Sequence, residues 1–129
     1  GDREFIEKVR RYRKIFGGGM RQVGILAAAG IYAIEHNIDR LKEDHQKAKL
    51  FAEGISKISD LIINKNLVET NIVMFSPKSI SVDEFLIRCK QKGLFFGTGK
   101  VGVIRAVTHM DVSFEQINEA IKIIETILD

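Results

Sequence analysis

The sequence has 129 residues, of which 45% are hydrophobic and 29% charged, a composition typical of one globular domain with a sizeable core. Its 20 basic residues are largely offset by 17 acidic ones, so the net charge of +3 does not by itself indicate a nucleic-acid-binding protein. The single cysteine cannot form an internal disulfide, and no signal-peptide pattern is present, so we expect a cytoplasmic protein. Because the sequence begins at Gly1 without methionine, we also expect a trimmed or truncated product.

The first segment, residues 2–16, has the pattern of an amphipathic helix with a cluster of cations near its end. The cluster consists of Arg10, Arg11, Arg13 and Lys14. Cations in the last turn of a helix interact favourably with its dipole, which explains them without any ligand. A nucleic-acid-binding patch is the alternative, but no interleaved aromatic residues or binding motif accompany the cluster. We therefore predict no nucleic-acid partner.

Three consecutive glycines, residues 17–19, join this segment to a second predicted helix over about residues 20–37. Glycine permits positive φ, and the start of a helix presents unpaired N–H groups and a positive dipole end. Such a junction suits an anion, and Arg21 in the first turn of the predicted helix would add donors for a phosphate or carboxylate. The alternative, a plain hinge with a solvated Arg21, is slightly favoured by spacing alone.

The second predicted helix is rich in small residues, namely Gly24, Ala27, Ala28, Ala29, Gly30 and Ala33. Small side chains let another element approach closely, so this helix is expected to pack against a larger partner. Its apolar run is too short to cross a bilayer, and we predict no membrane partner. Left uncovered, the same surface predicts oligomers or poor solubility.

A third helix is predicted from an N-cap at Asn37 to about Ile58. Its apolar stripe is expected to be buried, with the lysines and acids on the solvent side. His45 lies near the stripe, and we predict a buried, hydrogen-bonded structural histidine. Asp44 beside His45 does not give converging ligands at helical spacing, so no metal site is predicted.

Shorter periods follow, with strands expected at residues 67–69 and 71–75 and a turn at residues 76–79. Ser81 and Glu84 then form a capping box for a short helix that ends at Gly93. Cys89 follows the apolar stripe of that helix, which predicts a core thiol and not a nucleophile.

Residues 94–96 and 101–107 are predicted strands that flank Gly97-Thr98-Gly99-Lys100. Residues 97–102 formally match the dinucleotide-binding fingerprint, but here the glycines run into β-branched residues and do not open a helix. The P-loop motif is not matched by these residues either. We therefore predict that residues 97–100 form a hairpin turn between the two strands. Ser113, with Gln116 completing a capping box, should begin the last helix. The fold class is therefore α+β, with N-terminal helices followed by a small, mostly antiparallel sheet that carries helices on one face.

Arg105 is the second candidate for a functional residue, after Arg21. An arginine within a strand is costly to bury unless it meets an anion, and its planar fork suits a carboxylate. The alternative is that the other face of the strand is exposed and leaves Arg105 in water. The residues alone favour this alternative.

Three stretches resemble the low-specificity L-threonine aldolases, which are pyridoxal-phosphate enzymes of the aspartate-aminotransferase fold, fold type I. The longest runs from Arg10-Arg11-Tyr12-Arg13-Lys14-Ile15-Phe16-Gly17-Gly18-Gly19-Met20-Arg21-Gln22 through Ala27-Ala28-Ala29-Gly30 to Asp39-Arg40-Leu41-Lys42-Glu43-Asp44-His45. The second is Arg105-Ala106-Val107-Thr108-His109-Met110-Asp111-Val112, and a weaker third is Thr70-Asn71-Ile72-Val73. The resemblance covers nearly the whole chain, but it matches only about the last third of such an enzyme.

The resemblance implies an enzyme that cleaves threonine or allo-threonine to glycine and acetaldehyde, and that forms a homo-oligomer, a tetramer when complete. Residues 1–36 would link to an upstream large domain that holds the Schiff-base lysine, and residues 37–129 would form the small C-terminal domain. This chain alone would then not bind pyridoxal phosphate covalently and would be inactive.

The resemblance also implies roles for single residues. Arg21 matches the residue that approaches the cofactor phosphate, Arg105 the one that holds the substrate carboxylate, and Lys14 a residue near the active site. His109 and its neighbours are interpreted as turn and helix-entry residues, with a catalytic His109 as the weaker alternative. A different class of function stays open, in which the chain is an independent, non-catalytic domain that oligomerises and binds anions.

Overall fold

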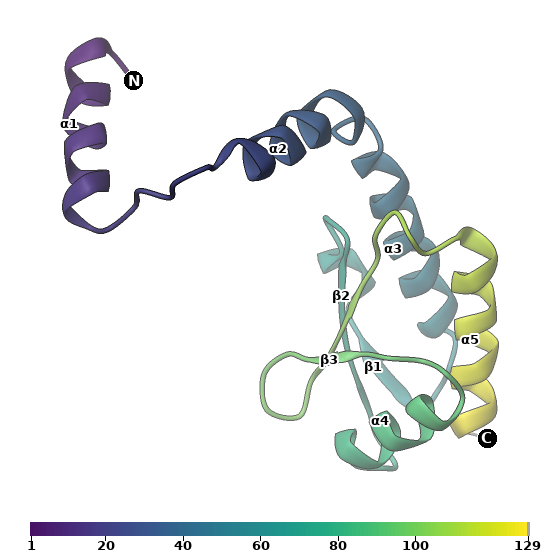
Figure 1. Cartoon of the computed structure of the whole chain (residues 1–129). Helices are drawn as coiled ribbons and strands as arrows, with labels where there is room; N and C mark the ends of the chain where they lie inside the picture. Colours follow the sequence, from purple (N-terminus) through teal and green to yellow (C-terminus); the bar gives the residue numbers. More distant parts are fainter. Residues whose placement is uncertain (129) are drawn as a thin grey trace. The chain divides into compact units, whose positions relative to one another are not determined.

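The computed structural model describes residues 1–128, which form five α-helices, one short 3-10 helix and four strands. The chain divides into two compact units, Gly1–Ile38 and Asp39–Asp129. The elements in chain order are α1 (Arg3–Ile15), α2 (Gly24–His36), α3 (Leu41–Ile55), β1 (Leu61–Ile63), η1 (Lys65–Leu67), β2 (Ile72–Pro77), α4 (Val82–Gln91), β3 (Gly97–Thr98), β4 (Ile104–Val107) and α5 (Phe114–Leu128) (Figure 1).

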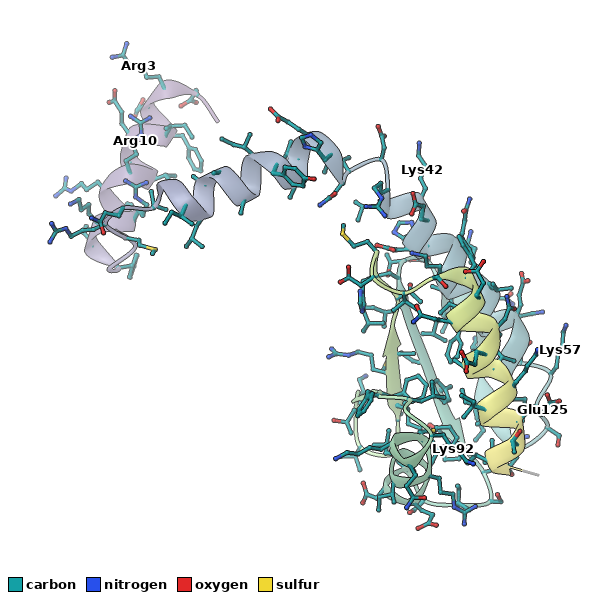
Figure 2. The ribbon with its side chains drawn as sticks, turned by 45° about the vertical axis from the view of Figure 1, so that its right-hand side comes forward. Arg3, Arg10, Lys42, Lys57, Lys92 and Glu125 are labelled. Carbon is teal, nitrogen blue, oxygen red and sulfur yellow. The ribbon has the colours of Figure 1, made fainter. Side chains whose placement is uncertain are left out.

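The first unit consists of α1, α2 and the segment between them. The Asp2 side chain caps α1 by accepting from the Phe5 N–H at 2.8 Å. Neither helix contains a buried residue. The basic side chains of α1 extend into solvent, as Arg3 and Arg10 illustrate (Figure 2).

The second helix begins later than predicted. Residues 21–23 form a turn and α2 begins at Gly24, so the prediction that Arg21 lies in the first turn of this helix is wrong. The physical reason is Gln22, whose φ of 53° is left-handed and cannot continue a right-handed helix. The predicted N-cap at Asn37 is also wrong, because Asn37 is the C-cap of α2 and α3 begins only at Leu41.

The second unit is built on an antiparallel sheet in the order β1-β2-β4-β3. β2 lies in the centre, pairing with β1 through Ile63 and Phe75 and with β4 through Met74 and Arg105. β3 and β4 form a hairpin, as predicted, but Gly97 and Thr98 lie in β3 and not in the turn, which begins only at Gly99. No helix follows these glycines directly, as expected for a false dinucleotide motif.

The core of this unit lies on one face of the sheet, where α3 and α5 lie side by side (Figure 1). Phe75 on β2 is its centre, with edge-to-face contacts to Phe51 of α3, Phe85 of α4 and Phe96. Gly54 allows α3 and α5 to approach closely, because a side chain there would collide with Ile121. The predicted α+β class, with helices on one face of the sheet, is confirmed.

Several boundaries differ from the predictions. Residues 67–69 do not form a strand. Lys65–Leu67 form the 3-10 helix η1, which the Asn64 side chain caps, and the strand β1 lies before it in the sequence. Residues 76 and 77 belong to β2 and not to a turn, while 94–96 and 101–103 lie outside the strands. Short strands depend on their pairing partners, which local patterns do not reveal.

Both predicted capping residues are confirmed. The Ser81 hydroxyl accepts from the Glu84 N–H at 3.1 Å at the start of α4. At the start of α5, the Gln116 N–H donates to the Ser113 hydroxyl at 3.2 Å, while the Ser113 N–H donates to the Gln116 side chain at 2.8 Å.

Candidate functional site

The helix-free face of the sheet, which we call the open sheet face, is formed by alternate residues of the central strands. In β4, Ile104 and Ala106 are buried in the core while Arg105 and Val107 are exposed, and β2 alternates in the same way. The apolar residues exposed on this face are Ile62, Ile72, Met74 and Val107. The face therefore presents the cation Arg105 among mostly apolar side chains, with Ser76 as a polar neighbour of Ile62.

Arg105 lies beside Gly97 of the neighbouring strand. A Cβ atom built on Gly97 would lie 3.7 Å from Nη2 and 3.8 Å from Nε of Arg105, so the guanidinium extends across the hydrogen atoms of this glycine. Within residues 1–128 Arg105 forms no ion pair with an acidic residue. Its planar donors are therefore accessible to an external anion.

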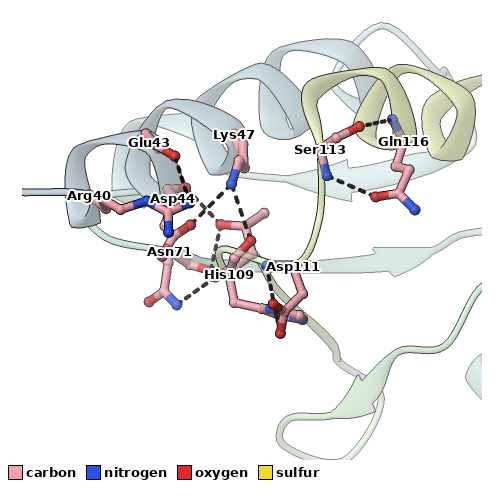
Figure 3. Close-up of polar contacts among 10 residues, drawn as sticks. Arg40, Glu43, Asp44, Lys47, Asn71, His109, Asp111, Ser113 and Gln116 are labelled. Carbon is pink, nitrogen blue, oxygen red and sulfur yellow. Dashed lines mark hydrogen bonds and ion pairs between the residues drawn. The ribbon is translucent and has the colours of Figure 1, made fainter. Parts of the chain in front are cut away.

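A buried polar network joins α3 to the segment that follows β4 (Figure 3). Lys47 is only 3% exposed, and its Nζ lies 3.3 Å from Asp44 Oδ1 and donates to the His109 carbonyl at 3.2 Å. The ammonium also lies 5.8 Å from the centre of the Phe114 ring. These three contacts satisfy a charge that would otherwise be costly to bury.

Thr108 connects this network to the sheet. Its hydroxyl donates to the Asp44 carbonyl at 2.7 Å, and its N–H donates to the Asn71 carbonyl at 2.9 Å. The Asn71 side-chain amide donates in return to the Thr108 carbonyl at 2.8 Å. The end of β4 is therefore held both by α3 and by the residue that precedes β2.

The prediction that the charged residues of the third helix face solvent is wrong for Asp44 and Lys47. They precede the buried Ala48, Phe51 and Ala52 at helical spacing, so they continue the apolar stripe toward the start of the helix. That spacing was the signal available in the sequence, and their charge concealed it. His45, by contrast, is only half-buried, with no ring hydrogen bond within the described residues, which corrects the expected buried histidine.

The glycine junction of the first unit forms a shallow hollow of about 440 Å³. It is lined by Arg13, the glycines at 17–19, Met20 and Val23. Arg21 and Lys14 are both exposed, and neither lines this hollow. That Arg21 binds an anion at this junction therefore stays a prediction. For Lys14, the position near the active site is likewise only what the resemblance implies.

Two other candidates have structural explanations. His109 is exposed, and its Nδ1 accepts from the Asp111 N–H at 3.3 Å, which is a turn interaction. Cys89 is fully buried, and burial raises the pKa of its thiol to about 12. A thiol that is neutral at physiological pH is a weak nucleophile, so the predicted core role of Cys89 is confirmed.

Among residues 1–128, the structure does not show a complete pyridoxal-phosphate site. Lys47, which is buried, bonds to Asp44 and His109, and an apolar hollow of about 340 Å³ beside α3 and α5 has no lysine in its lining. Among residues 1–128, no buried side-chain polar atom lacks a partner, and no cluster of metal-ligating side chains occurs.

Comparison with known proteins decides the family. The model of the beta-eliminating lyase family matches residues 1–78, which is more than half of the 129 residues. This chain belongs to the beta-eliminating lyase family. The match includes the basic helix, the glycine junction, α3 and the central strand β2, so the family signal extends through both units.

Two individual proteins that are similar in sequence to this chain are threonine aldolases, as the resemblance implied. The chain is 33% identical to low-specificity L-threonine aldolase 1 of Arabidopsis thaliana over 121 residues and 36% identical to the low specificity L-threonine aldolase of Escherichia coli over 119. Each alignment covers 92% of this chain and 34% of the relative. The chain thus spans about a third of the length of the curated relatives it matches.

A solved structure supports the fold. A structure of MppP soaked with the product 2-ketoarginine matches 74% of this chain and 30% of its own, with a TM-score of 0.59 at 8% identity. At this identity the match concerns the fold only. In the described part of the chain, no helix is long and apolar enough to cross a membrane.

Proposed function

We propose that this chain is the C-terminal part of a pyridoxal-phosphate-dependent lyase that cleaves L-threonine or L-allo-threonine to glycine and acetaldehyde. Membership of the beta-eliminating lyase family and the similarity to threonine aldolases support this reading. The observation that carries it is the position of Arg105, an arginine without an acidic partner in the described residues, on a mostly apolar open sheet face.

In this proposal Arg105 binds the α-carboxylate of the amino-acid substrate. A guanidinium presents two parallel N–H donors to a carboxylate, which fixes orientation as well as position. The apolar neighbours on the open sheet face exclude water once the face is covered, and that strengthens the ion pair. Gly97 leaves the guanidinium free to extend across β3.

The first unit would contribute the cofactor-side residues. Arg21 would bind the phosphate of pyridoxal phosphate, and Lys14 would lie near the active site, as the resemblance implies. The lysine that carries the cofactor would come from a large domain outside this sequence. On this reading the chain alone does not bind the cofactor covalently and has no aldolase activity.

The proposed partners follow from exposed apolar surface. Every residue of α2 is exposed, and Ile25 is 83% accessible. Apolar side chains all around a helix need protein on several sides, so we expect α2 to be covered by the large domain or by another subunit. We propose a homo-oligomer, a tetramer for the complete enzyme, in the cytoplasm.

The exposed α2 also favours the alternative function, a stand-alone oligomerisation domain that binds anions at residues 19–21 without catalysis. The two proposals differ in what Arg105 does. In the alternative, Arg105 is a surface residue with no substrate to bind.

A chimeric enzyme tests the proposal. Residues 1–129 would replace the matching third of the Escherichia coli aldolase, and the chimera would be assayed for glycine and acetaldehyde formation from L-threonine and L-allo-threonine. We expect activity, and Arg105→Ala should lower kcat/KM by about 10- to 150-fold, which corresponds to the roughly 1.5–3 kcal/mol of a charged hydrogen-bonded pair. The kcat/KM of Arg105→Lys should lie between those of the unchanged chimera and Arg105→Ala, since lysine keeps the charge but lacks the planar pair of donors.

Arg88→Ala is the matched control, because Arg88 is a partly exposed arginine already paired with Glu84 at 2.8 Å. It should leave kcat/KM unchanged. The absorption band of bound cofactor shows whether each chimera is assembled, and the isolated chain should retain no such band after dialysis. An assembled chimera whose activity is the same with Arg105 or alanine would contradict the proposal.

A further inference from the structure

The register between β2 and β4 decides which way Arg105 points. The two strands pair Ile72 with Val107 and Met74 with Arg105. Side chains alternate between the faces of a sheet, so a slip of one residue would turn Arg105 toward the core and Ala106 toward solvent. A function that depends on Arg105 therefore depends on whatever fixes this register.

β4 itself is too short to fix the register firmly. It has four residues, and its other neighbour, β3, has two. The ladder is extended by one pair beyond the strand, where Thr108 and Asn71 exchange the two bonds of 2.9 and 2.8 Å. Thr108 is only 3% exposed, so this extra pair is shielded from water.

Residues 108 and 109, which extend β4, are also hydrogen-bonded to α3. Lys47 holds the His109 carbonyl, and the Asp44 carbonyl accepts the Thr108 hydroxyl (Figure 3). Asp44 balances the charge of Lys47 at 3.3 Å. A slip of β4 by one residue would break both links and leave a buried ammonium without its carbonyl partner, which is strongly unfavourable.

We propose that the buried Asp44–Lys47 pair is a positioning element for Arg105, which holds residues 108–109 and thereby keeps the Arg105 side chain on the open sheet face. The inference rests on the proposed carboxylate-binding role of Arg105. It assigns to α3 a function beyond packing. Lys47 and Asp44 do not touch the substrate, and they act through the backbone of β4.

The test uses the full chain labelled with ¹⁵N and titrated with sodium acetate, with sodium chloride at equal ionic strength as the reference. The readouts are the shift of the Arg105 Nε–H signal, which gives a Kd for acetate, and the hydrogen exchange rates of residues 105–109. Urea unfolding gives the stability of each variant. Lys47→Met removes the positive charge and leaves the buried Asp44 carboxylate unpaired. The double variant, Asp44→Asn with Lys47→Met, removes both charges, so no unpaired carboxylate remains.

We expect Lys47→Met to raise the Kd of acetate about two- to thirtyfold and to speed exchange at residues 105–109. The double variant should recover most of the stability and yet keep the raised Kd, because the bond to the His109 carbonyl is still missing. Lys49→Met, an exposed position on the same helix, should change neither readout. A Kd that returns to the wild-type value along with stability would mean that the pair is only structural and would overturn the proposal.

A further variant decides the matter if Lys47→Met does not fold. Thr108→Val removes only the hydroxyl link to α3 and keeps both charges, and it should also raise the Kd and speed exchange. If the wild-type chain shows no acetate-dependent shift at Arg105, the carboxylate role proposed above fails, while exchange at residues 105–109 still tests the positioning role. Unchanged exchange in every folded variant would overturn that role.

Discussion

At the scale of single residues, burial sets the chemistry of the charged and reactive groups. The Lys47 side chain is buried where a carboxylate, a carbonyl and an aromatic ring replace its water. Cys89 has no such polar support, so burial raises the pKa of its thiol to about 12 from the ordinary value of 9.0. The second unit thus buries one side chain that has several polar partners and one thiol that has none.

Cys89 should be inert in the folded chain. With a thiol reagent at pH 8, we expect slow modification that follows the unfolding rate, and rapid modification once urea unfolds the chain. The folded state favours the neutral thiol, so the contribution of Cys89 to stability is complete below pH 9.0 and is lost as the pH rises toward about 12. Rapid modification of the native chain would show that the thiol is accessible.

At the scale of elements, local signals fix where helices begin when a side chain caps them. The N-cap serines, Ser81 and Ser113, place the starts of α4 and α5 within one residue of the structure. The predicted capping box is complete only at Ser113, because the Glu84 side chain pairs with Arg88 instead of Ser81. α2 and α3 have no side-chain cap, and both begin later than their apolar patterns suggest. A helix without a cap begins where the chain geometry allows, here after the left-handed Gln22.

The start of α5 offers a direct test. Ser113→Ala should lower the free energy of unfolding by about 1 kcal/mol, the usual contribution of an N-cap, and Ser113→Thr should retain most of it. The Ser113 side chain also lowers the pKa of the Glu115 carboxyl, so that pKa should rise in the alanine variant, as NMR titration would show. Because the folded pKa is lowered, this stabilising effect is present at neutral pH and is lost on acidification below the ordinary value of 4.5. An unchanged Glu115 pKa in Ser113→Ala would contradict the assignment.

At the scale of the whole molecule, the two units differ in how much they bury. The second unit has a continuous core from α3 through the sheet to α5, whereas α1 and α2 contain no buried residue. Isolated helices of 13 residues are marginal in water, so most of the stability of the chain resides in the second unit.

Hydrogen exchange of the full chain should show this difference. At low protein concentration, we expect strong protection in α3, β2, β4 and α5 and little in α1 and α2. Protection of α2 that increases with protein concentration would support the proposed self-association through this helix. Strong protection of α2 in dilute monomer would contradict the division of stability described here.

The α+β class, the starts of α4 and α5 and the presence of a hairpin between about residues 97 and 107 were predictable from local patterns, and the family from the three matching stretches. The residues alone favoured an exposed Arg105, as the structure has it, and only the resemblance gave this arginine a substrate to bind. The tertiary structure decided three things that involve distant parts of the chain: the open sheet face around Arg105, the burial of Asp44 and Lys47, and the bonds that join them to residues 108–109. The physical reason is that α3 bonds to residues far away in the sequence: Lys47 to the His109 carbonyl at a separation of 62 residues, and the Asp44 carbonyl to Thr108 at a separation of 64, both beyond the reach of any helical or strand period.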